Sequence, residues 1–249
     1  MMNRDTFYGG ISGLHTPIPK RDFPPAFADK SRLTYYSSIF NSIEINSSFY
    51  KIPISKTLFR WATDTPNYFR FTFKLWQGIT HNKDLAFNSA DVIQFIDQIN
   101  AVGLKKGCLL VQFPPRLTIA AIPQLSILLK TIKSADHHNE WRIAVEFRHR
   151  SWYEDTVYKL LDTHQACLVI HDLPASSTPL ITLNCDHVYV RFHGPNGGYR
   201  GSYSEDFLSE YASYVREWQD EEKTVYVYFN NTAGDALANL RYFISCIKT

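Results

Sequence analysis

Acidic and basic residues stand within or directly after several short apolar runs of the sequence. Glu146 and Arg148 follow the run 143–145, and Glu44 lies within the run Ser42–Ile45. Burial among apolar residues raises the pKa of a carboxyl, whereas a nearby cation holds a carboxyl ionised, so two such groups can divide the roles of acid and base. We therefore predict that Glu146 and Glu44 form a catalytic acid/base pair.

Three cations, Lys74, Arg148 and Arg191, also stand near the ends of apolar runs. A guanidinium group binds two oxygens of a phosphate or carboxylate through paired N–H groups. We therefore predict that these cations hold an anionic ligand. The alternative is that Glu146 pairs with Arg148, or Glu44 with Lys74, only to brace the scaffold.

Histidines supply further candidates for catalysis. His171, Asp172 and His193 follow apolar runs, and we predict that they orient groups in the reaction. Imidazoles and carboxylates on neighbouring strands can also bind a divalent metal. The histidines at positions 81, 149, 171 and 193 lack close zinc-type spacing, so the sequence predicts no metal ligands. A divalent metal is the less favoured alternative, and the cofactor is left open.

Polar and aromatic residues beyond other apolar runs are candidates for ligand contact. The residues predicted to bind a ligand are Ser12, Asn46, Lys74, His81, Gln112, Arg148, Arg191, Tyr199 and Asn230. Asparagine amides can read hydroxyl groups or bases, and an aromatic ring can stack on a sugar or a base. The glycine-rich segment 193–199 binds phosphate on its backbone N–H groups or serves as a plain or mobile turn.

The elements that must position these residues alternate in type along the chain. Apolar runs of strand length are Phe7–Ile11, Ser42–Ile45, 68–75, 107–113, 142–147, 166–170, His187–Phe192 and Thr224–Phe229. Segments of helical period are 32–40, 57–63, 90–102, 122–132, Asp155–Thr163, 204–218 and 234–247. The segment 173–184 is rich in Pro, Ser and Thr and predicts no helix.

Eight strands alternating with helices predict an α/β fold, a (β/α)₈ TIM-like barrel that forms one domain over residues 1–249. In such a barrel the carboxyl ends of the strands build the site, which is where the polar candidates fall. The rival is an open doubly wound sheet. No glycine-rich phosphate fingerprint follows the first strand, which counts against a dinucleotide-binding version.

The composition and net charge limit the kinds of partner that we expect for this protein. The 249 residues carry a net charge of +2, with 45% hydrophobic and 15% aromatic residues. A charge so near zero gives no strong attraction to nucleic acid or to an anionic membrane. No apolar segment approaches the ~20 residues of a membrane span, and the first residues lack the apolar run of a signal peptide. The four scattered cysteines predict buried free thiols, and we expect a cytoplasmic location.

The ordered set of motifs resembles a known family, domain of unknown function family 72, also called the YecE-like family. The matching segments are Gly10-Ile11-Ser12-Gly13, Glu44-Ile45-Asn46-Ser47-Ser48-Phe49-Tyr50, Trp61 with Thr65-Pro66, Phe71-Thr72-Phe73-Lys74, Thr80-His81, Gln112-Phe113-Pro114-Pro115, Glu146-Phe147-Arg148-His149 with Ser151-Trp152, His171-Asp172, Tyr189-Val190-Arg191-Phe192-His193-Gly194 and Tyr228-Phe229-Asn230-Asn231-Thr232. The resemblance implies a TIM-like barrel and no particular activity. The family usually has tryptophan where this chain has Leu14, which implies a different ligand surface if that position lines the site.

Two hypotheses for function follow. The first is an enzyme, a hydrolase or isomerase, that uses carboxylate acid/base chemistry on a small anionic or polyol substrate. The second is a non-catalytic module that binds nucleic acid through basic and aromatic residues at the barrel mouth. The near-neutral charge and the lack of a basic run count against the second. The sequence leaves the oligomeric state open.

Overall fold

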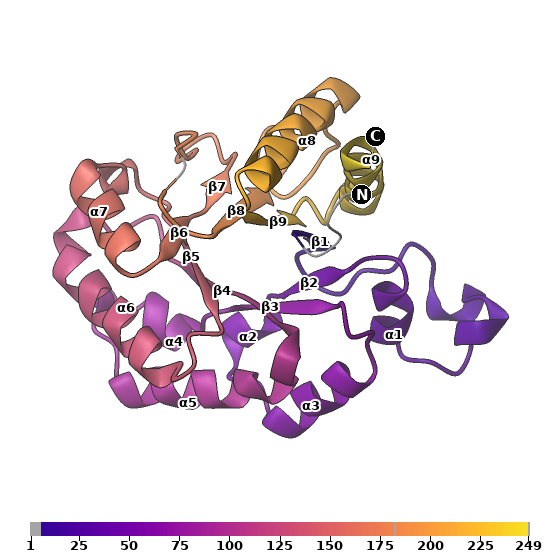
Figure 1. The fold of residues 1–249 in the computed structure, drawn as a ribbon, viewed down its shortest axis with the longest axis horizontal. Helices are drawn as coiled ribbons and strands as arrows, with labels where there is room; N and C mark the ends of the chain where they lie inside the picture. Colours follow the sequence, from indigo (N-terminus) through magenta and orange to yellow (C-terminus); the bar gives the residue numbers. More distant parts are fainter. Residues whose placement is uncertain (1–5, 182, 249) are drawn as a thin grey trace.

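Runs of β-branched and aromatic residues form parallel strands that are ringed by helices (Figure 1). The computed structural model describes residues 6–181 and 183–248. Its strands are β1 Phe7–Ile11, β2 Ser42–Ile45, β3 Arg70–Lys74, β4 Lys106–Gln112, β5 Arg142–Glu146, β6 Ala166–Leu168, β7 Ile170–His171, β8 His187–Phe192 and β9 Thr224–Phe229. Most strand residues are buried, as expected where a parallel sheet is covered on both faces.

Two parallel sheets, in the orders β1-β9-β8-β7 and β2-β3-β4-β5-β6, meet at two seams. At one seam Ser12 bridges to Glu44, and the Gly13 N–H donates to the Glu44 carbonyl at 2.8 Å. At the other seam only Val169 separates β6 from β7, and its N–H donates to the Val145 carbonyl at 2.9 Å. The predicted barrel is therefore confirmed, with its sixth strand broken at Val169.

The helices are α1 Arg32–Ser37, α2 Ser47–Tyr50, α3 Ser55–Thr63, α4 Gln77–Thr80, α5 Ser89–Ile99, α6 Ile122–Ala135, α7 Asp155–Thr163, α8 Glu205–Asp220 and α9 Ala236–Ile247. Short 3₁₀ turns occur at Lys20–Asp22, Pro25–Phe27, Lys83–Leu85, Asn100–Lys105, Ile119–Ala121 and Arg150–Trp152. The side chains of Asn88 and Ser204 accept the N–H groups of Ala90 and Phe207, so each residue caps the start of its helix.

The structure corrects some predicted bounds and adds two helices. The first long helix ends at Ser37 rather than at residue 40, and α5 passes into the 3₁₀ turn Asn100–Lys105 before Gly103 reverses the chain with φ 60°. The helices α2 and α4 directly follow β2 and β3 and were not predicted. As expected, the described part of the segment 173–184, which excludes Thr182, forms no helix or strand. Across the described residues, no helix is both long and apolar enough to cross a membrane.

Polar groups line much of the barrel interior. The Tyr228 hydroxyl, from β9, lies 2.6 Å from Ser42 Oγ and 2.8 Å from Thr72 Oγ1, so one side chain links β9 to β2 and β3. Buried hydroxyls are costly unless they are paired, and these three hydroxyls pair with one another inside the barrel. This layer lies beneath the carboxyl ends of the strands and supports the groups above it.

Glycine at position 10 lets β1 approach β2 closely. A Cβ atom on Gly10 would lie 2.3 Å from the Ser42 carbonyl oxygen and 3.0 Å from the Tyr228 ring. The carbonyl is backbone and cannot rotate away. A Cβ on the neighbouring Gly9 would instead meet only the side-chain ends of Phe7 and Leu240, at 3.0 and 3.1 Å.

We predict that Gly10→Ala lowers the free energy of unfolding by about 1–3 kcal/mol, because overpacking at the seam forces the backbone of β1 away from β2. Urea denaturation measures this loss. Gly9→Ala is the matched control, and it should cost less because the side chains of Phe7 and Leu240 can shift. Equal losses in the two variants would contradict the proposed contact at the seam.

Candidate active site

Arg191, which is 1% exposed on β8, is held between two carboxylates at the carboxyl ends of the strands. Its Nη2 donates to Glu44 Oε1 at 2.8 Å, and its Nε donates to Glu44 Oε2 at 3.1 Å. Its Nη1 donates to Glu146 Oε2 at 3.1 Å. Glu44 lies on β2 and Glu146 on β5, so the guanidinium spans the barrel and all three of its nitrogens are occupied.

Both carboxyls are fully buried, yet both are ionised. Burial opposes ionisation of Glu44, but the charge and hydrogen bonds of Arg191 and the hydroxyl of Tyr189 bring its pKa below the usual value. Burial likewise opposes ionisation of Glu146, and the charges of Arg148 and Arg191 hold its pKa well below the usual value. The prediction that burial raises one of the two pKa values is wrong, because one arginine lies between both groups.

Arg148 and Arg191 also fix the state of His193. Arg148 donates to Glu146 through Nε and lies 3.1 Å from His193 Nε2 through Nη2, while Arg191 Nη1 lies 3.2 Å from the same nitrogen. Guanidinium nitrogens only donate, so His193 Nε2 accepts and the ring proton lies on Nδ1. Burial lowers the pKa of His193 to about 4, so the ring is neutral at pH 7.

Asp172 orients the other side of the His193 ring. Its Oδ1 lies 3.4 Å from His193 Nδ1 and accepts the backbone N–H of His193 at 2.8 Å. Its Oδ2 accepts the hydroxyl of Tyr203. His171 is less free to act, because its Nε2 donates to the Phe147 carbonyl at 2.9 Å and its Nδ1 accepts the Leu173 N–H at 3.3 Å. Burial lowers the pKa of His171, in keeping with a neutral ring.

Lys74, the last residue of β3, forms fewer polar contacts with the protein than Arg148 or Arg191 does. Its Nζ lies 4.0 Å from the centre of the Phe49 ring, and no residue in the described part of the chain forms a hydrogen bond or an ion pair with it. Glu44 pairs with Arg191 instead of Lys74. Burial, followed by the charge of Arg191, lowers the pKa of Lys74 to about 7.

The short helices α2 and α4 place two further groups beside Lys74. Phe49 comes from α2, and its ring centre lies 4.8 Å from that of His81, which directly follows α4. His81 Nδ1 lies 2.8 Å from Thr80 Oγ1, and burial together with the charge of Lys74 lowers the pKa of His81 to about 4. The half-buried His81 is therefore neutral at pH 7.

The remaining predicted residues divide into paired and unpaired groups. Gln112 donates to the Phe113 carbonyl, whereas Ser12 Oγ, at the seam beside Glu44, is buried without a hydrogen-bond partner among the described residues. Asn46 Oδ1 is buried without a hydrogen-bond partner among the described residues, and the side chain of Asn230, 8% exposed, has none there either. The unpaired amides are therefore free to bind a ligand.

Tyr199 lies over the network from the solvent side. It is 43% exposed, and its ring centre lies 5.7 Å from that of His193. Its backbone N–H donates to the His193 carbonyl, which closes the glycine-rich turn 193–199 back onto β8. Most of the predicted site residues thus belong to one connected region at the carboxyl ends of the strands.

Three residues that hold this region together were not among the predicted site residues. Tyr189 lies two residues before Arg191, so strand alternation places both on the inner face of β8 and could have identified it. Phe49 follows Asn46 closely, but its contact with Lys74 depends on the unpredicted helix α2. Tyr203 reaches Asp172 from a loop, and no local pattern marks it. In the residues that the structure describes, no three His, Cys, Asp or Glu side chains are grouped as metal ligands would be.

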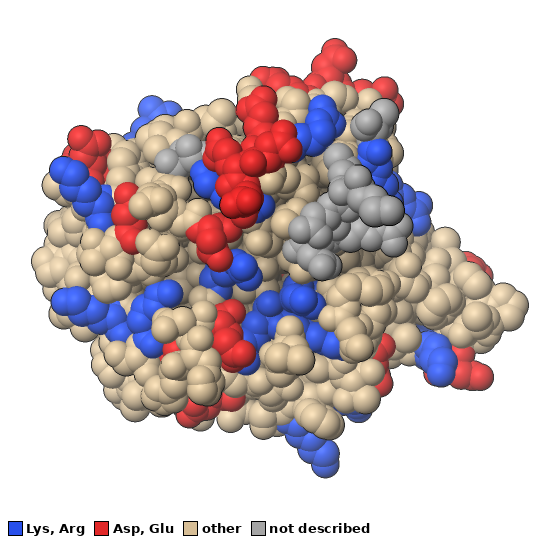
Figure 2. Space-filling view, in the orientation of Figure 1, with Lys and Arg blue, Asp and Glu red and all other residues tan. Residues whose placement is uncertain are grey.

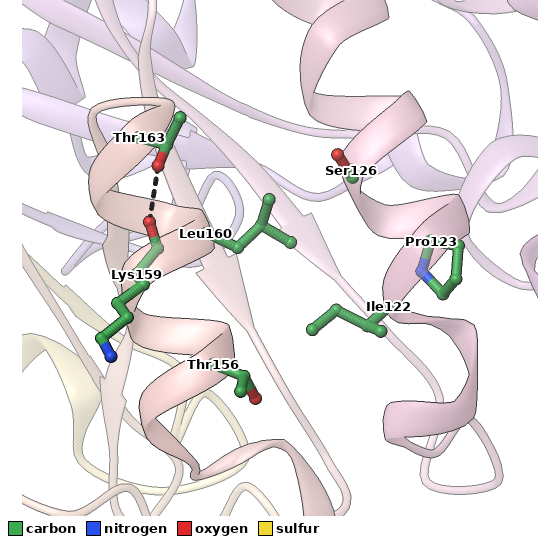
Figure 3. A pocket seen from close by; sticks show the side chains of 7 residues that line it. All are labelled: Ile122, Pro123, Ser126, Thr156, Lys159, Leu160 and Thr163. Carbon is green, nitrogen blue, oxygen red and sulfur yellow. Dashed lines mark hydrogen bonds between the residues drawn. The ribbon is translucent and has the colours of Figure 1, made fainter.

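Two hollows lie away from this region. A groove between α6 and α7 has Lys159 as its one charged lining residue (Figure 3). A cavity of about 730 Å³ lies at the amino ends of β3, β4 and β5. Figure 2 shows Lys and Arg side chains gathered near the middle of one face, between acidic ones. In the cavity at the amino ends of β3, β4 and β5, Glu140 and Asp186 are exposed and pair with Lys106 and Arg142 at 2.7 and 3.2 Å. These two ion pairs therefore contain no buried carboxylate.

The closed barrel and the ionic network at its carboxyl end define a (β/α)₈-barrel protein with its candidate site where such barrels usually carry one. The family described as "Protein of unknown function DUF72" matches residues 8–249, and the chain belongs to this family. The predicted family resemblance is therefore confirmed.

Other proteins are similar to this one in sequence or fold along nearly the whole chain. UPF0759 protein YunF of Bacillus subtilis (strain 168) is 28% identical over 264 residues, covering 93% of this chain and 91% of YunF. The crystal structure of a DUF72 family protein from Thermotoga maritima MSB8 has a TM-score of 0.77 and 26% identity, covering 98% of this chain and all of that one, 100%. A DUF72 family protein from Enterococcus faecalis V583 has a TM-score of 0.78 and 20% identity, covering 98% and 96%.

We predict that Arg191→Met lowers the free energy of unfolding at pH 7 by about 3–5 kcal/mol, because it leaves Glu44 and Glu146 without their shared cation. In the wild type the lowered carboxyl pKa values stabilise the fold above the unfolded-state pKa of about 4.3, and this contribution is lost as the pH falls. In the variant burial raises the pKa of Glu44, while Arg148 still pairs with Glu146, so the difference between variant and wild type should shrink between about pH 6 and pH 4. Urea denaturation across this range measures it.

Two further variants sharpen the test. Arg216→Met removes a guanidinium that donates to the Cys246 carbonyl from α8, and its cost should be small and independent of pH. Adding Glu44→Gln to Arg191→Met should recover part of the lost stability, since it removes one uncompensated charge. A pH-independent loss in Arg191→Met, with no recovery in the double variant, would contradict the shared-cation interpretation.

Proposed function

We propose that this protein is an enzyme that acts by proton transfer, as a hydrolase or isomerase, on a small anionic or polyol substrate at the carboxyl end of the barrel. The observation that carries the proposal is the amine of Lys74, which is partly buried beside an ionic network but has no polar partner of its own. A buried polar group without a partner is costly unless a ligand or a reaction uses it.

The network itself supplies a fixed electrostatic frame. Arg191 and Arg148 hold Glu44 and Glu146 in place through charge-assisted hydrogen bonds. These ion pairs keep both carboxylates ionised, so neither carboxylate exchanges a proton near pH 7. A rigid set of charges that needs no reorganisation is what stabilises charge developing in a transition state. We therefore assign the two carboxylates to the frame, in place of the acid/base roles that the sequence predicts for them.

Lys74 is the group best suited to acid/base work in the described site. Its pKa of about 7 lets it both give and take a proton near neutral pH. The unpaired amides of Asn46 and Asn230 suit substrate hydroxyls. The side chain of Arg148 is 10% exposed, with its Nη1 free of hydrogen bonds to described residues, and suits an acidic group of the substrate.

We predict that a small sugar phosphate or sugar acid raises the melting temperature of the purified protein, since a ligand that binds only the folded state stabilises it by mass action. Lys74→Met should weaken the binding about tenfold, which corresponds to about 1.4 kcal/mol. In the wild type the affinity should fall as the pH rises through 7, because the ammonium loses its proton, and the variant should lack this dependence. Thermal shift and isothermal calorimetry measure both.

Lys51→Met is the matched control, since Lys51 is exposed at the end of α2 and contributes only its backbone N–H, which bonds to Ser47. It should leave binding unchanged. Short oligonucleotides belong in the same screen. A shift that occurs with oligonucleotides alone, disappears in salt and is unaffected by Lys74→Met would overturn the enzyme proposal in favour of nucleic-acid binding.

A further inference from the structure

Lys74 has the surroundings that turn a lysine into a nucleophile: an unpaired amine, partial burial and neighbouring positive charge. We propose that Lys74 forms an imine with a small aldehyde or ketone that carries an acidic group. The inference rests on the proposed function, because it names the substrate class and the covalent step of the same site.

An aromatic ring, and no polar partner among the described residues, lies against the amine. The Phe49 ring covers the amine, with its centre 4.0 Å from Nζ, and its centre also lies 4.8 Å from that of His81. A ring face donates no N–H or O–H group to the amine, and no described residue forms a hydrogen bond with it, so the lone pair of the neutral amine is not taken up by a protein donor in the described site. The apolar cover also limits the access of water, which would otherwise hydrolyse an imine.

The titratable groups that face Lys74 come from three strands and one helix end. Arg191 lies on β8 and Arg148 follows β5, while His81 follows α4. Glu44 on β2 and Glu146 on β5 have their oxygens taken up by the two arginines. Burial and the charge of Arg191 lower the pKa of Lys74, the charges of Glu146 and Glu44 oppose them in part, and the resulting pKa of about 7 leaves a substantial fraction of the amine neutral near pH 7.

The covalent step is balanced without a further reactant. The amine nitrogen bonds to the carbonyl carbon, the C=O π pair moves to oxygen, and the amine proton transfers to that oxygen to give a carbinolamine. Loss of the hydroxyl and the second amine proton as water leaves the C=N bond. Nothing is oxidised or reduced. The acidic group of the carbonyl compound would lie toward Arg148 Nη1 and the amide of Asn46, which have no hydrogen-bond partner in the part of the chain that is described.

Trapping with glyoxylate and cyanoborohydride at pH 7 tests the proposal. Hydride adds to the imine carbon and leaves a carboxymethyl group on the lysine, which peptide mass spectrometry locates. We expect Lys74 to be labelled at least about tenfold faster than the exposed Lys51 or Lys83, because an ordinary lysine is neutral to less than about one part in a thousand at this pH. Neutral acetaldehyde should label Lys74 more slowly than glyoxylate does.

Each comparison has an outcome that overturns part of the proposal. Labelling of Lys74 no faster than that of Lys51 would exclude the imine, and equal rates with acetaldehyde and glyoxylate would exclude a preference for acidic compounds. Lys74→Arg should keep the wild-type circular dichroism spectrum and lose the fast site. If Lys74 is not labelled but the ligands of the thermal-shift screen still depend on it, the imine fails and the proposed function stands. If no ligand depends on Lys74 either, both fail.

Discussion

The buried ion pairs of Arg191 with Glu44 and Glu146 are the interaction on which the site depends. Burying two carboxylates inside a barrel would cost several kcal/mol for each charge without a partner. The guanidinium offsets that cost from a third strand, β8, and its planar shape binds Glu44 through two nitrogens while it reaches Glu146 with another. Lysine could not replace it, because a single ammonium lacks this fork. The rotamers of all three residues are therefore fixed by one another.

The same interaction reinforces the closure of the barrel. Glu44 is the residue whose backbone carbonyl accepts the Gly13 N–H at the seam between the two sheets, and its side chain pairs with Arg191 across the barrel. Among the described residues, backbone pairing at the seam between β1 and β2 is limited to the contacts of Ser12 and Gly13 with Glu44, so the side-chain pairing adds to it. Gly10 contributes to the closure from β1, because the absence of a side chain there lets β1 lie close to Ser42 on β2. The stability of the scaffold and the geometry of the site thus share residues.

The sequence predicts the fold well because each strand and long helix has its own local signal. Continuous apolar runs identify the strands, and Asn88 and Ser204 mark helix starts by a side-chain bond that needs no tertiary context. The break at Val169 has no such signal, since the run 166–170 is apolar throughout. The helices α2 and α4, of four residues each, are too short to show a helical period. They nevertheless place Phe49 and His81, so the part of the mouth that they build could not be predicted.

The sequence predicts which residues form the site, but it does not predict which of them pair with one another. Strand ends identify Glu44, Lys74 and Arg191, but which cation each carboxylate takes depends on distances across a closed barrel. That pairing decides the protonation states. Arginines keep their protons at any ordinary pH, so burial, aided by neighbouring positive charge, lowers the pKa of the groups that can lose a proton, Lys74 and His81. A network that looks merely structural therefore contributes, together with burial, to the reactivity of the amine beside it.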